Sequence, residues 1–341
     1  MNQEFCLFQV DKKRVIWEVT KFCNYHCKHC CASAEIIDTK DELKLDNFIK
    51  ALDEMKEYGV EEIYFSGGEP FSRKDILQIL KKAVDNGIKC NISTNGSLIT
   101  ENIAKELKKL NINKVHISLD HYDKEKFNSF RGGEYFEPTI NAIRLLKDNN
   151  IYVRVGAVIW KENVKQIEEM IQYLINLNVD EVVFNWLIKV GRLTKNEDVC
   201  VNISEFDSTI NKIRELKKKC EKNIKVSMHR SCKFEDSNQI CPGGEDFFYI
   251  SPEGKLAPCS WIKKMDKNTI SKNSLKEKSF LEIVKEDNFK KFNNMKNERK
   301  EKYKTGCPAI CFERNNTYFS KDPLLLEKEE KYGKCSKCMS V

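Results

Sequence analysis

The sequence predicts an α/β fold: a partial (β/α)6 TIM-like barrel with a small cysteine-rich C-terminal extension. Strand-like and helix-like segments alternate from about residue 15 to residue 228, and short loops join them. Beyond residue 228 the alternation stops, while cysteine and then lysine become frequent. Strands that alternate with helices are typical of a parallel sheet. Six such repeats are too few for a complete eight-fold barrel, so we expect a partial one.

Seven apolar segments have the length and composition of strands. They are residues 15–20, 62–66, 89–93, 114–119, 152–159, 181–186 and 225–228. Six segments between them are predicted helices, because their apolar residues recur at spacings of three and four. They are residues 46–58, 73–86, 101–110, 138–149, 163–177 and 204–220. Gly59 and Gly87 are expected helix ends, and Ser204 is a candidate N-cap.

Composition excludes several classes of protein. We divide the 341 residues into an N-terminal segment (1–14), the barrel (15–228) and the extension (229–341). No apolar run approaches the length of a membrane helix, and residues 1–14 lack the apolar centre of a signal peptide. We therefore expect a cytoplasmic protein with no membrane partner. The net charge of +7 is mild and both signs are spread along the chain, so we expect no nucleic-acid partner.

Fifteen cysteines in a reducing compartment favour metal ligation, redox chemistry or catalysis over a disulfide framework. Cys23, Cys27 and Cys30 form C-x3-C-x2-C directly after the first predicted strand. Three thiolates can hold three irons of a [4Fe–4S] cluster and leave the fourth iron open to an external ligand. The alternative is a structural zinc ion, with His26 or His29 as its fourth ligand.

A C-x3-C-x2-C loop after the first strand of a partial barrel resembles the radical SAM superfamily. The resemblance implies that the open iron binds S-adenosylmethionine (SAM). Reductive cleavage of SAM would then give methionine and a 5′-deoxyadenosyl radical, which abstracts a hydrogen atom. A reductant such as flavodoxin or ferredoxin is implied as a partner. His29, the residue before the last cysteine of the motif, would lie near the adenine.

Polar groups follow the next three predicted strands, where α/β barrels bind ligands. Ser66-Gly67-Gly68-Glu69-Pro70 resembles the family's methionine-amino-binding motif. Its glycines allow backbone to approach a ligand closely, and Glu69 can accept a hydrogen bond from an ammonium group. Ser93-Thr94-Asn95-Gly96 and Ser118-Leu119-Asp120 resemble contacts to the ribose and carboxylate of SAM. Arg131-Gly132 also fits the family, and Arg131 could contact a carboxylate.

The extension contains a second set of spaced cysteines. Cys241 and Cys259 fit C-x12-G-x4-C around a predicted hairpin, whose turn has Pro at its second and Gly at its fourth position. This pattern resembles the opening of the SPASM/twitch extension, which holds auxiliary iron–sulfur clusters. Cys307, in a Gly-Cys-Pro-Ala run, resembles a later ligand of that site, and Cys232 could complete the set. A zinc ribbon is the alternative.

The extension also departs from the full SPASM pattern. A C-x2-C-x5-C run is expected just before Cys307, but residues 292–305 contain no cysteine. Cys311, Cys335 and Cys338 could form a second cluster, or one of the last two could replace Cys232 in the first. We therefore predict one or two auxiliary [4Fe–4S] clusters.

The resemblance predicts hydrogen abstraction from a peptide or protein substrate, as in thioether or carbon–carbon crosslinking. One alternative is oxidation or decarboxylation of a tetrapyrrole side chain in the haem pathway. Formylglycine maturation of sulfatases is disfavoured, because Ser260 follows Cys259 where those enzymes carry an acidic residue. A non-catalytic iron–sulfur or zinc-binding protein is the remaining alternative.

Two further features bear on the substrate. The first cysteine motif begins close to the start of the sequence, at Cys23, so we expect no N-terminal leader-binding domain. A separate leader-binding protein is then a candidate partner. The segment Trp186–Arg192 resembles a glycine–arginine stretch of peptide-modifying and haem-pathway enzymes alike, so it does not discriminate between them.

Overall fold

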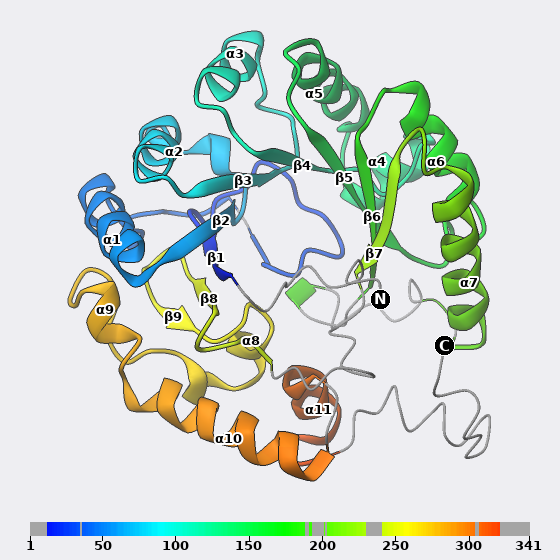
Figure 1. The fold of residues 1–341 in the computed structure, drawn as a ribbon. Helices are drawn as coiled ribbons and strands as arrows, with labels where there is room; N and C mark the ends of the chain where they lie inside the picture. The colour runs from blue at the N-terminus through cyan, green and yellow to red at the C-terminus, as the bar shows by residue number, and fades with distance from the viewer. Residues whose placement is uncertain are drawn as a thin grey trace.

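The computed structural model describes residues 12–34, 36–187, 191–192, 201, 203–229, 241–303 and 307–320. The seven predicted strands are present and pair in parallel in chain order. They are β1 (Lys13–Glu18), β2 (Val60–Ser66), β3 (Lys89–Thr94), β4 (Lys114–Ser118), β5 (Val153–Ile159), β6 (Glu181–Trp186) and β7 (Lys225–His229). The strands curve around a common axis, with the helices on the outside (Figure 1). The predicted partial barrel is therefore confirmed.

The six predicted helices follow their strands on the outer face. They are α1 (Leu45–Tyr58), α2 (Ile76–Asp85), α3 (Glu101–Lys109), α5 (Phe136–Asp148), α6 (Ile167–Asn176) and α7 (Ile203–Lys219). Apolar residues between the two layers form the core. On β1, Trp17 is fully buried and its ring stacks on Phe48 of α1 at 4.5 Å between centroids. This packing fixes the strand from which the first cysteine loop departs. Gly59 ends α1 in the left-handed region, as expected, with φ of 86°.

The predicted hairpin of the extension joins the barrel sheet. Strand β8 (Phe247–Ile250) runs parallel to β1, with Trp17 opposite Ile250, and β9 (Leu256–Ala257) pairs antiparallel to β8. The sheet order is β7-β6-β5-β4-β3-β2-β1-β8-β9, so β7 and β9 form its edges among the described residues. The hairpin thus lies against the strand that leads to the first cysteine motif.

Several helices lie outside the six predicted for the barrel. Helix α4 (Lys124–Arg131) begins after Asp123, whose carboxylate accepts a hydrogen bond from the Lys126 N–H at 3.0 Å, and it ends at Gly132. In the extension, short α8 (Ile262–Met265) and α9 (Phe280–Ile283) precede α10 (Asp287–Tyr303) and α11 (Pro308–Asn315). Along α10 the charged residues outnumber the apolar ones, so its periodicity is weak. No helix in the described ranges has the length and apolar character needed to span a membrane.

Candidate functional site

The first cysteine motif lies in a loop that leaves β1 at the carboxyl end of the barrel sheet. Cys23 and Cys27 are buried and Cys30 is half-buried. Tyr25, between the first two cysteines, stacks on Tyr135 with 3.5 Å between ring centroids. The three predicted cluster ligands therefore share one small, largely dehydrated region.

The three thiols interact electrostatically. Burial raises the pKa of Cys23 to about 11, and the charges of Glu69, Cys27 and Cys30 contribute to the rise. Burial also raises the pKa of Cys27. A cationic centre bound among the sulfur atoms would remove this penalty, because metal ions deprotonate the thiols that coordinate them. Among the described residues no three His, Cys, Asp or Glu side chains converge on a single-ion site, whereas a [4Fe–4S] cluster places each thiolate on its own iron.

The loop Gly67–Pro70 packs against the segment that precedes Cys23. The N–H of Gly68 donates to the carbonyl of Thr20 at 2.7 Å, and the N–H of Glu69 donates to the carbonyl of Phe22 at 2.8 Å. A Cβ on Gly68 would lie 1.9 Å from the Phe22 carbonyl oxygen, and a Cβ on Gly67 would lie 2.4 Å from that of Thr20. The sequence predicted that these glycines admit a ligand. In the structure a neighbouring stretch of backbone makes this close approach, and contact of the two glycines with a ligand stays a prediction.

The Glu69 carboxylate is fully buried and accepts hydrogen bonds from three groups of the chain. They are the Phe71 N–H at 3.1 Å, the Thr94 hydroxyl at 2.7 Å and the Asn95 N–H at 2.8 Å. Burial raises the pKa of Glu69 to about 7, although these hydrogen bonds lower it. Glu69 therefore ties the loop after β2 to the loop after β3, while Pro70 begins a short 3-10 helix.

Asn95 connects the β3 loop to the cysteine loop. Its side-chain amide donates to the Asn24 side chain at 2.9 Å and lies 3.9 Å from the Cys23 sulfur. Ser93 and Ser118 are half-buried at the carboxyl ends of β3 and β4. Asn95 thus places a predicted polar group of the β3 end beside the part of the loop that carries Cys23.

Asp120 and Arg131 form a buried ion pair beside Cys27. Both Nε and Nη2 of Arg131 donate to one Asp120 oxygen, at 2.7 and 2.6 Å, and Nη1 lies 3.6 Å from the Cys27 sulfur. Burial lowers the pKa of Arg131, but the negative charges of Asp120 and Cys27 more than compensate and raise it. A permanent positive charge therefore faces the second cysteine of the motif.

His29 lies over the same ion pair. Its Nε2 is 3.5 Å from the Asp120 carboxylate, and its ring stacks on Phe130 at 4.1 Å between centroids. Phe130 in turn stacks on Trp160 at 4.0 Å. Burial lowers the pKa of His29 to about 4, so the ring is neutral at pH 7. Its buried Nδ1 has no hydrogen-bond partner in the described part of the chain.

The structure assigns a contact to the glycine–arginine stretch that the sequence left without a role. Arg192 donates from Nε to the Cys27 carbonyl at 2.9 Å and from Nη1 to the Ala34 carbonyl at 2.6 Å. Gly191 has φ of 66°, and a Cβ there would lie 2.4 Å from the Cys30 carbonyl oxygen. The stretch therefore holds the far end of the cysteine loop. The Gly-Arg pair after the sixth strand was the signal available in the sequence.

Three cysteines of the extension also lie close together. Burial raises the pKa of Cys241 to about 12 and that of Cys259 to about 11, and the charge of Cys307 contributes to both rises. Cys311 is fully buried, with its sulfur 3.0 Å from Nη2 of Arg299. The remaining predicted ligands, Cys232, Cys335 and Cys338, lie outside the described residues.

Comparison with known proteins identifies both regions. The family model of the radical SAM superfamily matches residues 17–174, and that of the SPASM iron–sulfur cluster-binding domain matches residues 241–312. An AdoMet-dependent heme synthase of Nitratidesulfovibrio vulgaris is 24% identical over 95% of this chain and 94% of its own. A PqqA peptide cyclase of Bradyrhizobium diazoefficiens is 26% identical over 72% of this chain and 66% of its own.

The fold is also that of solved structures. The crystal structure of Streptococcus suis SuiB bound to S-adenosylmethionine has a TM-score of 0.76 at 18% identity, over 91% of this chain and 76% of that chain. The two family models together cover the cysteine loop, most of the barrel and the hairpin of the extension. The chain therefore belongs to the radical SAM superfamily and carries a C-terminal SPASM iron–sulfur cluster-binding domain.

Proposed function

We propose that this protein cleaves SAM reductively and abstracts a hydrogen atom from a peptide or protein substrate. The observation that carries the proposal is the meeting of the cysteine loop, the Gly67–Pro70 loop and the Asp120–Arg131 ion pair at one end of the barrel. The family implies a [4Fe–4S] cluster, auxiliary clusters and SAM. When bound, the first cluster supplies the electron that cleaves SAM to methionine and a 5′-deoxyadenosyl radical.

The residues present fit this cluster. We assign Cys23, Cys27 and Cys30 as its ligands, because their thiols are close, and those of Cys23 and Cys27 are buried and costly to ionise without a bound cation. The Arg131 guanidinium favours the thiolate form of Cys27. Neutral His29 presents an apolar ring to the same region, which suits a stacking contact better than an ionic one.

The SAM contacts follow from the strand ends. We assign them to His29 and Arg131 and to the loops after β2, β3 and β4: Gly67, Gly68, Glu69, Pro70, Ser93, Asn95, Ser118 and Asp120. Both carboxylate oxygens of Glu69 already accept hydrogen bonds from the chain. Glu69 therefore shapes its loop, while Oε2, which accepts only one of these bonds, and the loop carbonyls keep acceptor sites for an ammonium group.

We assign Cys241, Cys259 and Cys307 to an auxiliary cluster, with Cys232 as the predicted fourth ligand. Cys311 already has a charged partner, because Nη2 of Arg299 lies 3.0 Å from its sulfur. Whether Cys311 joins Cys335 and Cys338 in a second auxiliary cluster stays a prediction. The division into a segment 1–14, a barrel 15–228 and an extension 229–341 is likewise proposed. We also propose a cytoplasmic location, because a reducing compartment keeps this many cysteine thiols available as cluster ligands.

The relatives support two substrate classes. Similarity to a peptide cyclase and the fold shared with SuiB, which was also solved bound to the precursor peptide SuiA, support a peptide. A flavodoxin or ferredoxin is the proposed reductant, and a leader-binding protein is a candidate partner. A tetrapyrrole is the second candidate, because the similarity to a heme synthase extends over 95% of the chain. Both candidates use the same SAM chemistry and differ in the molecule that loses hydrogen.

The first experiment measures iron, zinc and 5′-deoxyadenosine in anaerobically reconstituted protein. We expect about eight irons per chain, little zinc, and dithionite-dependent 5′-deoxyadenosine by mass spectrometry. Cys27→Ala should abolish the product and leave about four irons. Cys90→Ala is the matched control, because Cys90 is also buried but lies within β3. Stoichiometric zinc with little iron, or product formation by Cys27→Ala, would refute the proposal.

A second experiment separates the substrate classes. Iron coproporphyrin III and short peptides encoded next to the gene are each added to the reduced enzyme with SAM. A peptide that accelerates 5′-deoxyadenosine formation and changes in mass supports the first proposal. A shift of the porphyrin Soret band with loss of carboxyl groups from the tetrapyrrole would overturn it in favour of the second.

A further inference from the structure

A short extended segment, residues 19–22, connects β1 to the first cysteine. On one side it is bonded to the loop after β2: the Val19 N–H donates to the Ser66 carbonyl at 2.8 Å, and Gly68 and Glu69 donate back to it. The segment therefore sets the distance between the cysteine loop and the loop proposed to meet the methionine part of SAM.

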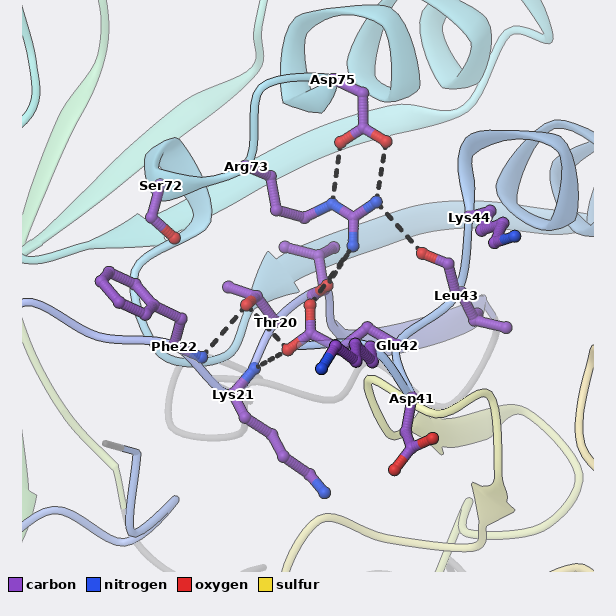
Figure 2. Close-up of polar contacts among 12 residues, drawn as sticks. Thr20, Lys21, Phe22, Asp41, Glu42, Leu43, Lys44, Ser72, Arg73 and Asp75 are labelled. Carbon is purple, nitrogen blue, oxygen red and sulfur yellow. Dashed lines mark hydrogen bonds and ion pairs between the residues drawn. The ribbon is translucent and has the colours of Figure 1, made fainter. Parts of the chain in front are cut away.

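A buried carboxylate holds the other side of this segment. Oε1 of Glu42 accepts a hydrogen bond from the Thr20 hydroxyl at 2.9 Å and another from the Lys21 N–H at 2.7 Å. The same Thr20 hydroxyl accepts the Phe22 N–H at 3.1 Å. Figure 2 shows the bonds from Thr20 and Lys21 meeting at Glu42, which comes from the loop before α1, and the bond from Phe22 ending on Thr20. One side chain thus orders three consecutive residues just ahead of Cys23.

Arg73 contacts both the segment 19–22 and the carboxylate of Glu42. Its Nη1 donates to the Val19 carbonyl at 3.0 Å and lies 3.5 Å from Oε2 of Glu42. Nη2 donates to the Leu43 carbonyl at 3.2 Å, and Asp75 holds the guanidinium in a fork at 2.9 and 2.8 Å. The side chains of Arg73 and Glu42 are only 11% and 7% exposed. Arg73 therefore locks the loop that carries Glu42 onto the segment that Glu42 binds (Figure 2).

The same contacts reach the extension. The Leu43 N–H donates to the Pro252 carbonyl at 2.9 Å, and Lys21 forms an ion pair with Glu253 in the same turn. The hairpin between the auxiliary cysteines is therefore seated on the residues that flank Glu42. A displacement of Glu42 would therefore also displace the segment before Cys23 and the turn of the hairpin between Cys241 and Cys259.

We propose that Glu42 and Arg73 are positioning residues for SAM binding. The proposal rests on the proposed function, because it presumes that SAM lies between the cysteine loop and the Gly67–Pro70 loop. In the described part of the chain neither side chain has a hydrogen bond to a cysteine, so their loss should leave cluster assembly intact. What changes is the relative position of two loops that must contact one SAM molecule.

The test compares Arg73→Gln, Arg73→Lys and Glu42→Gln with the wild type. Arg154→Gln is the matched control: Arg154 pairs with Glu181 at 2.7 Å, their side chains are 10% and 1% exposed, and the pair joins β5 to β6. Four quantities are measured: iron per chain, thermal midpoint, KM for SAM in 5′-deoxyadenosine formation, and the SAM-induced change in the electron paramagnetic resonance spectrum of the reduced cluster.

We expect wild-type iron content in every variant. Arg73→Gln should raise KM for SAM about 10-fold, which is the size of effect typical when a residue that supports metal ligands is mutated. The SAM-induced change in the spectrum of the reduced cluster should then need about 10-fold more SAM. Arg73→Lys should restore part of the affinity for SAM, since lysine keeps the charge but cannot form the fork. Arg154→Gln should lower the thermal midpoint without moving KM.

Three results would overturn the proposal: a KM within about 2-fold of wild type in folded Arg73→Gln, an equal rise in Arg154→Gln, or loss of iron with no separate effect on SAM. If Arg73→Gln fails to fold, Asp75→Asn tests the positioning role of Arg73 with a smaller change. It weakens only the two hydrogen bonds between the Arg73 guanidinium and Asp75. An unchanged KM in that folded variant then counts against the proposal. A wild type that forms no 5′-deoxyadenosine refutes the proposed function instead.

Discussion

Substituting Gly68 by alanine tests whether close packing of two backbones builds the site. Gly68 has an ordinary φ, so alanine adds no backbone strain of its own. The new Cβ would lie 1.9 Å from the Phe22 carbonyl oxygen, whereas ordinary contact begins at 3.4 Å. The Gly67–Pro70 loop and the segment before Cys23 must therefore move apart until the new Cβ and the Phe22 oxygen reach ordinary contact distance.

The structure gives the magnitude of the effect. Separation breaks the hydrogen bonds from Gly68 to Thr20 and from Glu69 to Phe22. At about 1 kcal/mol each, their loss lowers the free energy of unfolding by about 2 kcal/mol. A chain of this size should lose about 3 °C in its thermal midpoint. A misplacement of about 1 Å or more should also lower kcat/KM for SAM about 100-fold.

Gly87→Ala supplies the matched control. Gly87 has φ of 79° and nothing within 4 Å of an added Cβ, so alanine there costs about 1–2 kcal/mol of backbone strain without a collision. Differential scanning fluorimetry and SAM-dependent 5′-deoxyadenosine formation are measured on both variants. We expect similar losses of stability and a loss of activity in Gly68→Ala alone. Wild-type kinetics in Gly68→Ala would show that the close approach has no part in the site.

Three further predictions use other parts of the chain. Cys241→Ala should lose about four irons and keep the SAM-dependent electron paramagnetic resonance signal; loss of that signal would contradict two separate sites. Arg192→Lys removes the guanidinium that bridges the Cys27 and Ala34 carbonyls, so a chelator should strip iron faster from this variant than from wild type; equal rates would contradict the role of Arg192. Burial, with the charge of Arg154, lowers the pKa of His116 from 6.5 to about 3. The unfolded chain thus binds the extra proton, and stability should fall as pH drops below 6.5, by up to about 1.4 kcal/mol per unit. His116→Asn should flatten that slope in acid titrations of unfolding, and an unchanged slope would refute the assignment.

The strands were predictable because each is a short apolar run bounded by turn residues, as in residues 62–66 and 181–186. The cysteine spacing likewise predicts which loop carries the cluster, and the buried thiols of that loop support this assignment, which stays a prediction. The partner of the glycine loop was not predictable: two glycines show that something comes close, but not whether it is ligand or backbone. The pairing of β8 with β1 was equally hidden, since the whole barrel lies between these two strands in the sequence.

Glu42 and Arg73 were missed for a different physical reason. They stand in the charged stretches DELKLD and SRKD, which have the composition of a solvated surface. Charge pattern predicts exposure on average, and a buried ion pair forms only where the fold brings two such stretches together. The same holds for Asp120 and Arg131, whose contact with each other depends on the turn between β4 and α4.

The residues between β1 and α1, numbers 19–44, contain no helix or strand in their described part. Ordering such a loop costs about 1–2 kcal/mol per residue in backbone entropy, so it needs external partners. The structure supplies them from three other connections, those after β2, β3 and β6, through Gly68, Arg73, Asn95 and Arg192. Removing any one of these partners raises the free energy of the ordered loop without removing a single cysteine. The affinity for SAM should therefore depend also on Arg73 and Arg192, which are not among the assigned SAM contacts, and the site extends to every loop that holds the cysteines in place.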